Sequence, residues 1–280
     1  FKILTLQSLY NLSDDATEYQ IRDRLTFMRF LGLAPGGRVP DAKTIWLFRE
    51  QLTEAEVIDD LFGRFDQHLR KNGFQARRGQ IVDASIVPAP VQRNSREENA
   101  EIKEGRIPEA WEGHRAKLGQ KDTDAAWTKK NGVSHFGYKN HVNVDAKHKF
   151  IRQWEVSDAS IHDSQMLPAL IDEHGKSRRL YADAAYTGKE TQRDLRRRGY
   201  LAHFQEKGAR GKPLNKKGTE RNRRLSKVRS RVEHVFGIMR KRMGETVVRA
   251  VGWERCRMKI GLRNLAYNID RYAMLRKAMG

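Results

Sequence analysis

The sequence predicts an α/β fold, in which a mixed five-stranded sheet flanked by helices follows an N-terminal helical region. Residues 1–75 show apolar spacing and capping residues typical of helices. From residue 80 onward, short runs rich in branched and aromatic residues alternate with helical segments. The chain has 280 residues, which is enough for a sizeable hydrophobic core. We therefore divide it into 1–75, an α/β domain over 76–250, and a C-terminal closing helix over 251–280.

The N-terminal region contains three predicted helices, over residues 13–31, 40–52 and 53–71. Ser13 is a typical N-cap residue, and Gly32 is expected to end the first helix. The second helix leaves helix-turn-helix DNA binding open, although the region has only 10 Lys and Arg against 11 Asp and Glu. We expect the region to serve in DNA binding or dimerisation. Because the chain begins at Phe1, we also expect residues upstream.

The α/β domain is predicted as three strands followed by alternating helices and strands. We expect strands over 80–85, 136–144, 150–156, 179–183 and 200–205, and helices over 163–174, 189–198 and 228–243. Residues 88–131 lack a sustained apolar period and are expected to form a long insertion or flexible loop. Residues 206–227 are expected to be a basic linker that precedes the last of these helices.

Three acidic residues lie where separate elements could bring them together. Asp83 and Asp183 end two predicted strands, and Glu233 lies within a predicted helix. Convergent carboxylates repel one another unless a cation joins them, and hard divalent cations such as Mg²⁺ prefer oxygen ligands. The pattern therefore predicts a metal site for phosphoryl transfer. On the helix, Arg229 and Arg240 are expected on the same side as Glu233, beside an apolar stripe formed by Val232, Val235, Phe236, Met239 and Met243.

The charge distribution indicates a polyanionic partner. The formal net charge is +20, and residues 76–280 hold 45 Lys and Arg against 24 Asp and Glu. The stretch 206–231 alone has 11 Lys and Arg against 2 acidic residues, and we expect Arg221, Arg223 and Arg224 to contact phosphates there. Cys256 is the only cysteine, so an intramolecular disulfide and a Cys-rich zinc module are excluded. No apolar run is long enough for a membrane span, and we expect a cytoplasmic protein.

Five short motifs follow one another along the chain. They are Ile81-Val82-Asp83-Ala84-Ser85, Gly137-Tyr138-Lys139-Asn140-His141, Ala159-Ser160-Ile161-His162-Asp163-Ser164, Tyr181-Ala182-Asp183-Ala184-Ala185-Tyr186 and Arg229-Ser230-Arg231-Val232-Glu233. These motifs and their order resemble the DDE-type transposases of bacterial insertion sequences, in the branch around insertion sequence five, related to the insertion-sequence-four group. The resemblance implies a ribonuclease-H-like catalytic domain. Related families carry Tyr, Arg, Glu and Lys on the glutamate helix. Here those positions hold Ser226, Arg229, Glu233 and Arg240, so any role of the tyrosine is in doubt.

The resemblance implies cut-and-paste transposition by a cytoplasmic protein that associates with the bacterial nucleoid. Asp83, Asp183 and Glu233 would hold two Mg²⁺ ions, for which Mn²⁺ can substitute. Double-stranded DNA would bind as terminal inverted repeats and as target, and a homodimer would bring two ends together. Two alternatives remain open, namely another ribonuclease-H-like nuclease and a domesticated DNA-binding protein without catalysis.

Other side chains invite smaller roles. Lys139 is expected to contact substrate phosphate, and Asp163 is expected to cap a helix in preference to acting as a fourth metal ligand. His141 and His234 are interpreted as structural or DNA-facing, since Mg²⁺ prefers oxygen. Trp111 and Trp127 are expected to be exposed in the insertion, where stacking on bases, contact with a partner and anchoring of the loop all remain open.

Overall fold

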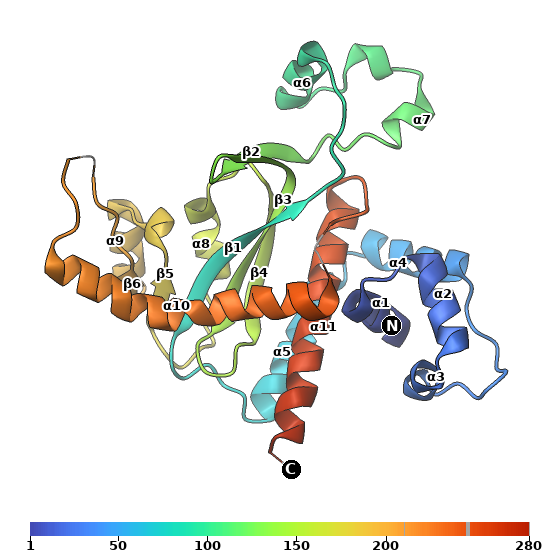
Figure 1. Ribbon diagram of the computed structural model, residues 1–280, viewed down its shortest axis with the longest axis horizontal. Helices are drawn as coiled ribbons and strands as arrows, with labels where there is room; N and C mark the ends of the chain where they lie inside the picture. The colour runs from blue at the N-terminus through green and yellow to red at the C-terminus, as the bar shows by residue number, and fades with distance from the viewer. Residues whose placement is uncertain (210, 245–246, 280) are drawn as a thin grey trace.

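The computed structural model describes residues 1–209, 211–244 and 247–279 (Figure 1). Its strands form one mixed sheet in the order β2-β3-β1-β5-β6, and β4 pairs with β3 on the side away from β1. The strands are β1 Gln80–Pro88, β2 Ala126–Lys130, β3 Val133–Asp145, β4 Ile151–Asp158, β5 Arg179–Ala182 and β6 Leu201–Phe204. The α/β prediction is confirmed, but the described sheet has six strands, because β2 was not expected.

The strands β1 to β4 pair antiparallel with one another, whereas β1, β5 and β6 pair parallel. β1 pairs antiparallel with β3, and β3 pairs antiparallel with both β2 and β4. β1 pairs parallel with β5, with Ile81 opposite Tyr181, and β5 pairs parallel with β6. The carboxyl ends of β1 and β5 therefore lie at the same edge of the sheet.

Side-chain alternation gives the sheet two buried faces. Ile81, Val87 and Tyr181 belong to a core that includes residues of the two long C-terminal helices. Val82 and Leu180 point to the opposite face and belong to a second core. The first face is covered by α10 (Lys216–Met243), α11 (Trp253–Lys277) and α5 (Ile58–Lys71), and the second by α8 (Leu167–Leu170) and α9 (Lys189–Arg197).

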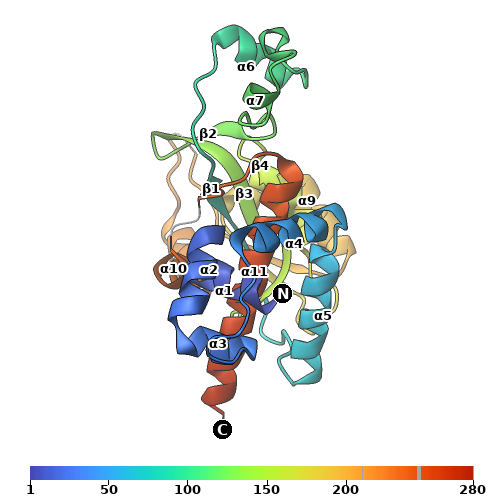
Figure 2. The same cartoon turned by 90° about the vertical axis from the view of Figure 1, so that its right-hand side faces the viewer.

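The N-terminal helices are α1 Lys2–Tyr10, α2 Asp14–Asp23, α3 Leu25–Leu31 and α4 Ala42–Glu54. They lie beside α11, which stands between most of them and the sheet (Figures 1 and 2). The single helix predicted over 13–31 is wrong, because Arg24 is extended (φ −108°, ψ 110°) and separates α2 from α3. The caps are confirmed: Ser13 accepts from Ala16 N, Asp41 accepts from Thr44 N, and Gly32 has a left-handed φ of 79°.

The insertion over 88–131 is not a structureless loop. It contains α6 (Arg96–Lys103), the short 3₁₀ helix η1 (Glu109–Trp111), α7 (Arg115–Leu118) and β2, and its helices project away from the sheet (Figure 2). Trp111 is buried and its Nε1 donates to Glu98 Oε1 at 2.5 Å, so its predicted exposure is wrong. Trp127 is 48% exposed, as expected.

Two further predictions, the linker over 206–227 and the helix over 163–174, are wrong. Helix α10 begins at Lys216, where Asn215 caps it by accepting from Gly218 N, so residues 216–227 are helical and do not form a linker. The helix expected over 163–174 is a 3₁₀ turn, η2 (Asp163–Met166), followed by the one-turn α8. A third 3₁₀ turn, η3 (Ala184–Tyr186), follows β5.

One glycine allows three strands to meet. Gly137 on β3 pairs with both Pro88 on β1 and Ala126 on β2, and its φ is 146°. A Cβ atom there would lie 2.3 Å from the carbonyl oxygen of Val87. Only glycine permits this backbone approach, which joins the β2–β3 hairpin to the end of β1.

Candidate functional site

Strand parity places the first two predicted carboxylates on one face of the sheet. Asp83 follows Ile81 by two residues, and Asp183 follows Tyr181 by two residues. Ile81 and Tyr181 face each other in register and belong to the core beneath α10. Because side chains alternate along a strand, Asp83 and Asp183 leave adjacent strands toward the same helix.

Asp83 is a largely buried carboxylate with one cationic partner. Its side chain is 18% exposed, and its Oδ2 lies 3.1 Å from Nη2 of Arg229. Its Oδ1 accepts from the backbone N–H of Ala84 at 2.8 Å. Burial raises the pKa of Asp83 above its usual value, and the nearby charge of Asp183 raises it further, while Arg229 opposes both. The two aspartates therefore repel each other.

Asp183 is held at the junction between β5 and η3. Its side chain caps the 3₁₀ turn, where Oδ1 accepts from the backbone N–H of Ala185 at 2.9 Å. The cap fixes the carboxylate beside Asp83 and leaves its second oxygen without a hydrogen bond to any other described residue.

Helix α10 supplies the third carboxylate and two arginines. Val232, Val235, Met239 and Met243 are buried and Phe236 is half-buried, so the predicted apolar stripe is confirmed. Glu233 and Arg240 are exposed beside that stripe, and Arg229 is 14% exposed. The buried Nε of Arg229 has no hydrogen-bond partner.

These side chains border one open cleft between the sheet and α10. The cleft is lined by all three predicted carboxylates together with Arg229 and Arg240. Lys130 on β2, and His135 and Asn140 on β3, line it as well. Within the described ranges, however, no group of three His, Cys, Asp or Glu side chains is close enough to hold a metal ion. The aspartates converge, and Glu233 borders the same cleft from a solvent-exposed position.

Lys130 and His135 were missed because the β2–β3 hairpin was missed. The hairpin turns at Asn131-Gly132, whose φ angles are 51° and 81°. Two successive positive φ angles identify a type I′ turn, for which Asn-Gly is the preferred pair. That dipeptide was visible in the sequence and could have placed both residues near the end of β1.

Gln205, which follows β6, is a second residue that the sequence did not reveal. Its Oε1 accepts from Nη1 of Arg229 at 2.6 Å, and its Nε2 donates to Oγ of Ser226 at 2.7 Å. Gln205 thus connects the sheet edge to α10 and holds the guanidinium that pairs with Asp83. Ser226, which stands where related families have tyrosine, serves here as the acceptor for this amide.

We expect Gln205→Leu to lower the free energy of unfolding by about 1–2 kcal/mol, because it removes two hydrogen bonds and leaves a guanidinium N–H of Arg229 without an acceptor. Denaturant unfolding measures the change. Gln192→Leu on the exposed side of α9 is the matched control and should cost no more than about 0.5 kcal/mol. Equal effects of the two substitutions would show that the Gln205 contacts do not stabilise the fold.

Several other predicted residues lie elsewhere. Lys139 donates to the carbonyl of Ile161 at 2.6 Å and lies 2.8 Å from Oδ1 of Asp163, so its ammonium is engaged away from the carboxylate cleft. Asp163 is not the helix cap, because His162 occupies the N-cap position of η2 and accepts from Ser164 N.

The two histidines that the sequence singled out, His141 and His234, each lie close to a polar side chain of the protein. His141 is buried and its Nε2 lies 2.8 Å from Oγ of Ser157. Burial lowers the pKa of His141 to about 4, so its ring is neutral near pH 7. Nδ1 of His234 lies 3.1 Å from Nζ of Lys149.

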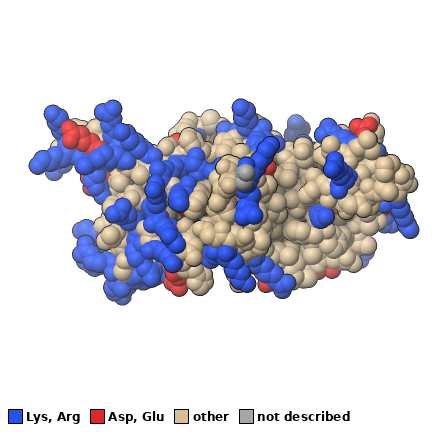
Figure 3. Space-filling view, turned by 90° about the horizontal axis from the view of Figure 1, so that it is seen from below, with Lys and Arg blue, Asp and Glu red and all other residues tan. Residues whose placement is uncertain are grey.

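The first three turns of α10 carry the predicted phosphate-binding arginines. Arg223 and Arg224 are exposed, whereas Arg221 pairs with Glu206 at 2.5 Å. Figure 3 shows that Lys and Arg side chains gather over the half of the molecule that contains α9, β6 and the start of α10, and are sparser over the N-terminal helices. One residue of the predicted basic stretch, at position 210, lies outside the described residues.

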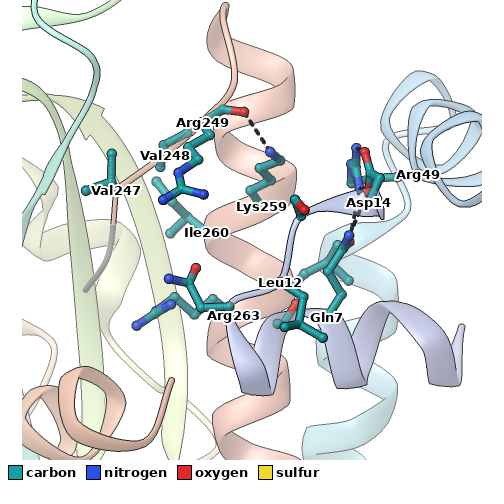
Figure 4. Close-up of a pocket in the computed structure, with 14 residues that line it drawn as sticks. Gln7, Leu12, Asp14, Arg49, Val247, Val248, Arg249, Lys259, Ile260 and Arg263 are labelled. Carbon is teal, nitrogen blue, oxygen red and sulfur yellow. Dashed lines mark hydrogen bonds and ion pairs between the residues drawn. The ribbon is translucent and has the colours of Figure 1, made fainter. Parts of the chain in front are cut away.

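A smaller cavity between α1, α4 and α11 is lined by polar side chains that mostly bind one another (Figure 4). Arg49 forms a bidentate pair with Asp14 at 2.6 and 2.8 Å, and Gln7 donates to the same carboxylate at 2.7 Å. Lys259 donates to the carbonyl of Arg249 at 2.8 Å. The contacts of Asp14 join α1, α2 and α4 to one another, and we assign the cavity no chemistry.

Two family models match the chain. A model described as Transposase DDE domain matches residues 74–269, which include Asp83, Asp183 and Glu233. A model described as Transposase domain (DUF772) matches residues 1–51. No solved structure matches the chain significantly.

Proposed function

This chain belongs to the family of transposases with a DDE domain, and we propose that it cleaves the ends of an insertion sequence and joins the resulting 3′-OH ends to target DNA. The observation that carries the proposal is the single cleft lined by Asp83, Asp183 and Glu233 together with Arg229 and Arg240. Carboxylates serve to hold cations, and arginines bind phosphate, so the cleft combines the two requirements of phosphoryl transfer on DNA.

The strand order supports a ribonuclease-H-like fold for the domain over 76–250. When β2 is set apart as part of the insertion, the five predicted strands lie in the order β4-β3-β1-β5-β6. Along the chain, the three antiparallel strands β1, β3 and β4 are thus followed by the parallel strands β5 and β6. Asp83 lies on β1, the first of these five strands in the sequence, and Asp183 directly follows β5, the fourth. This is the arrangement that the resemblance to the insertion-sequence-five branch implies.

The residues present fit a hard divalent cation by their chemistry. Asp83 and Asp183 supply two adjacent carboxylates, and the raised pKa of Asp83 reflects a negative charge that burial and Asp183 both disfavour. A bound cation relieves both effects. Asp83, Asp183 and Glu233 would hold the ions, provided that the exposed Glu233 side chain turns into the cleft.

Bound divalent cations would supply activation of the attacking oxygen and charge neutralisation at the scissile phosphate. The chain's own side chains position the DNA. Arg229 pairs with Asp83 and lines the cleft, so its guanidinium lies beside the place where a phosphate would bind. Arg240 lies about three turns further along α10 at the same cleft, and its planar guanidinium suits bidentate phosphate binding.

The proposal is tested by incubating the chain with duplex DNA that carries the sequences flanking its own coding region, in Mg²⁺ and in EDTA. We expect new 3′-OH ends and joined products in Mg²⁺ and neither in EDTA. Cleavage without joining would instead identify a nuclease, and tight binding without cleavage would identify a DNA-binding protein that lacks catalysis.

A further inference from the structure

A second groove lies on the other side of α10 and is lined by six cationic side chains. They are Arg77, Arg78, Lys176, Arg178, Arg179 and Arg231. No Asp or Glu is among the described residues that line this groove, which we call the basic groove. None of these six residues was given a role from the sequence, because they come from three separate parts of the chain.

Three of these six cations have no hydrogen-bond or ion-pair partner among the residues that the structure describes. The side chains of Arg78, Lys176 and Arg179 are exposed and form no hydrogen bond or ion pair with another described residue. Arg178 donates to Tyr200 Oη at 2.8 Å, and Arg231 donates to the carbonyl of Ala146. Elsewhere, exposed arginines such as Arg22, Arg64 and Arg197 each lie within 3.1 Å of a carboxylate on their own helix. Clustered cations without carboxylates repel one another, so the basic groove favours an anionic partner.

The basic groove and the carboxylate cleft lie at opposite ends of the same strands. Arg77 and Arg78 precede β1, and Arg179 is the first residue of β5. Asp183 directly follows the four-residue β5, so its backbone lies roughly 13 Å from that of Arg179 at about 3.3 Å per residue. That distance corresponds to about four base-pair steps of 3.4 Å. One phosphate cannot occupy both sites, but two points on bound duplex DNA can.

We propose that the basic groove binds the phosphate backbone of duplex DNA at a point remote from the phosphate that reacts. The inference rests on the proposed function, since it names a second place where the same DNA substrate is held. Helix α10 separates the two sites, with Arg229 and Glu233 beside the carboxylate cleft and Val228 and Arg231 beside the basic groove. DNA that reaches both sites therefore crosses the helix that carries Glu233.

The first test is the salt dependence of binding to a random-sequence duplex, measured by fluorescence anisotropy. The triple variant Arg78→Gln, Lys176→Gln and Arg179→Gln should flatten the slope of log K against log salt concentration by about 2 to 3, since each phosphate contact contributes about 0.9. The matched control is Arg22→Gln, Arg64→Gln and Arg197→Gln. It also removes three exposed charges, but each of those is already paired with a carboxylate. Its slope should remain within about 0.5 of that of the unaltered chain.

A second measurement does not depend on removing side chains. Leu201 lines the basic groove and is 59% exposed, whereas the single native cysteine, Cys256, is buried and its thiol pKa is raised to about 12 by burial. An iron chelate can therefore be attached selectively to Leu201→Cys, and hydroxyl radicals should cut bound DNA there. The same chelate on Tyr19→Cys of α2, a position 64% exposed, should cut more weakly.

The outcomes separate the two proposals. An unchanged salt slope in the triple variant, together with no excess cutting from Leu201→Cys, overturns the basic groove and leaves the proposed function intact if the unaltered chain still cleaves DNA. Failure of the unaltered chain to bind duplex DNA at all overturns both. The conservative variant Arg78→Lys with Arg179→Lys should keep the original slope, because it keeps the charge.

Discussion

Asp83→Asn, Asp183→Asn and Glu233→Gln are each expected to reduce DNA cleavage and joining by about three orders of magnitude, while the dissociation constant for duplex DNA changes little. Each substitution removes a negative charge that would hold a cation at the scissile phosphate, and an amide is a far weaker ligand for a hard ion. DNA affinity should persist because it depends on Lys and Arg contacts to phosphates over a wide surface. Cleavage is measured on labelled duplexes at saturating protein.

The three substitutions should differ in their effect on stability. Glu233 is exposed and has no ionic partner among the described residues, so Glu233→Gln should leave the free energy of unfolding within about 0.5 kcal/mol of the original. Asp83→Asn leaves the largely buried Arg229 without its counter-ion and should cost more. Thermal unfolding in the absence of DNA separates these cases from loss of catalysis.

Glu220→Gln is the matched control for Glu233→Gln, because Glu220 is an exposed glutamate on the same helix that does not line the cleft. It should retain full cleavage. Near-normal cleavage by any one of the three cleft variants would remove that residue from the catalytic site. Loss of cleavage in Glu220→Gln would show that charge along α10, not the cleft, controls activity.

The parts of the site that could be predicted from sequence follow from local periodicity. Alternation along β1 and β5 and the 3.6-residue repeat of α10 place Asp83, Asp183 and Glu233 on surfaces that face one cleft. Both periods depend on the backbone alone. The contacts of Arg229 with Asp83 and with Gln205 could not be predicted, because they join residues 146 and 24 positions apart.

The missed elements lack apolar patterning for identifiable reasons. Strand β2 has no buried residue, since it extends the sheet where one face lies open to solvent. The first part of α10 projects beyond the core and buries only Gly218 and Leu225 before Val232. Its sequence therefore lacks the regular spacing of apolar residues by which a helix is recognised. The break at Arg24 has no proline or glycine to mark it. In each case the hydrophobic signal was absent, and only the Asn131-Gly132 turn offered an alternative.

The largest stability effect is expected from Arg152→Met. Arg152 is 1% exposed on β4, lies 2.7 Å from Asp66 of α5 and 3.3 Å from Asp145 of β3, and donates to the carbonyl of Phe74. Its removal leaves the fully buried Asp145 without this counter-ion, and breaking a buried ion pair by removing one partner costs about 3–5 kcal/mol. Denaturant unfolding at pH 7 measures the loss.

The cause of that loss can be isolated with two further variants. Arg64→Met on α5 removes an exposed arginine that pairs with Asp60 at 2.8 Å, and it should change stability by at most about 1 kcal/mol. The double variant Arg152→Met with Asp145→Asn removes the orphaned charge and should recover part of the stability. The two residues are not coupled if Asp145→Asn lowers the free energy of unfolding as much in the Arg152→Met background as it does in the unaltered chain. The attachment of α5 to the sheet would then rest on apolar packing around Phe62 and Ile58, which belong to the core under α11.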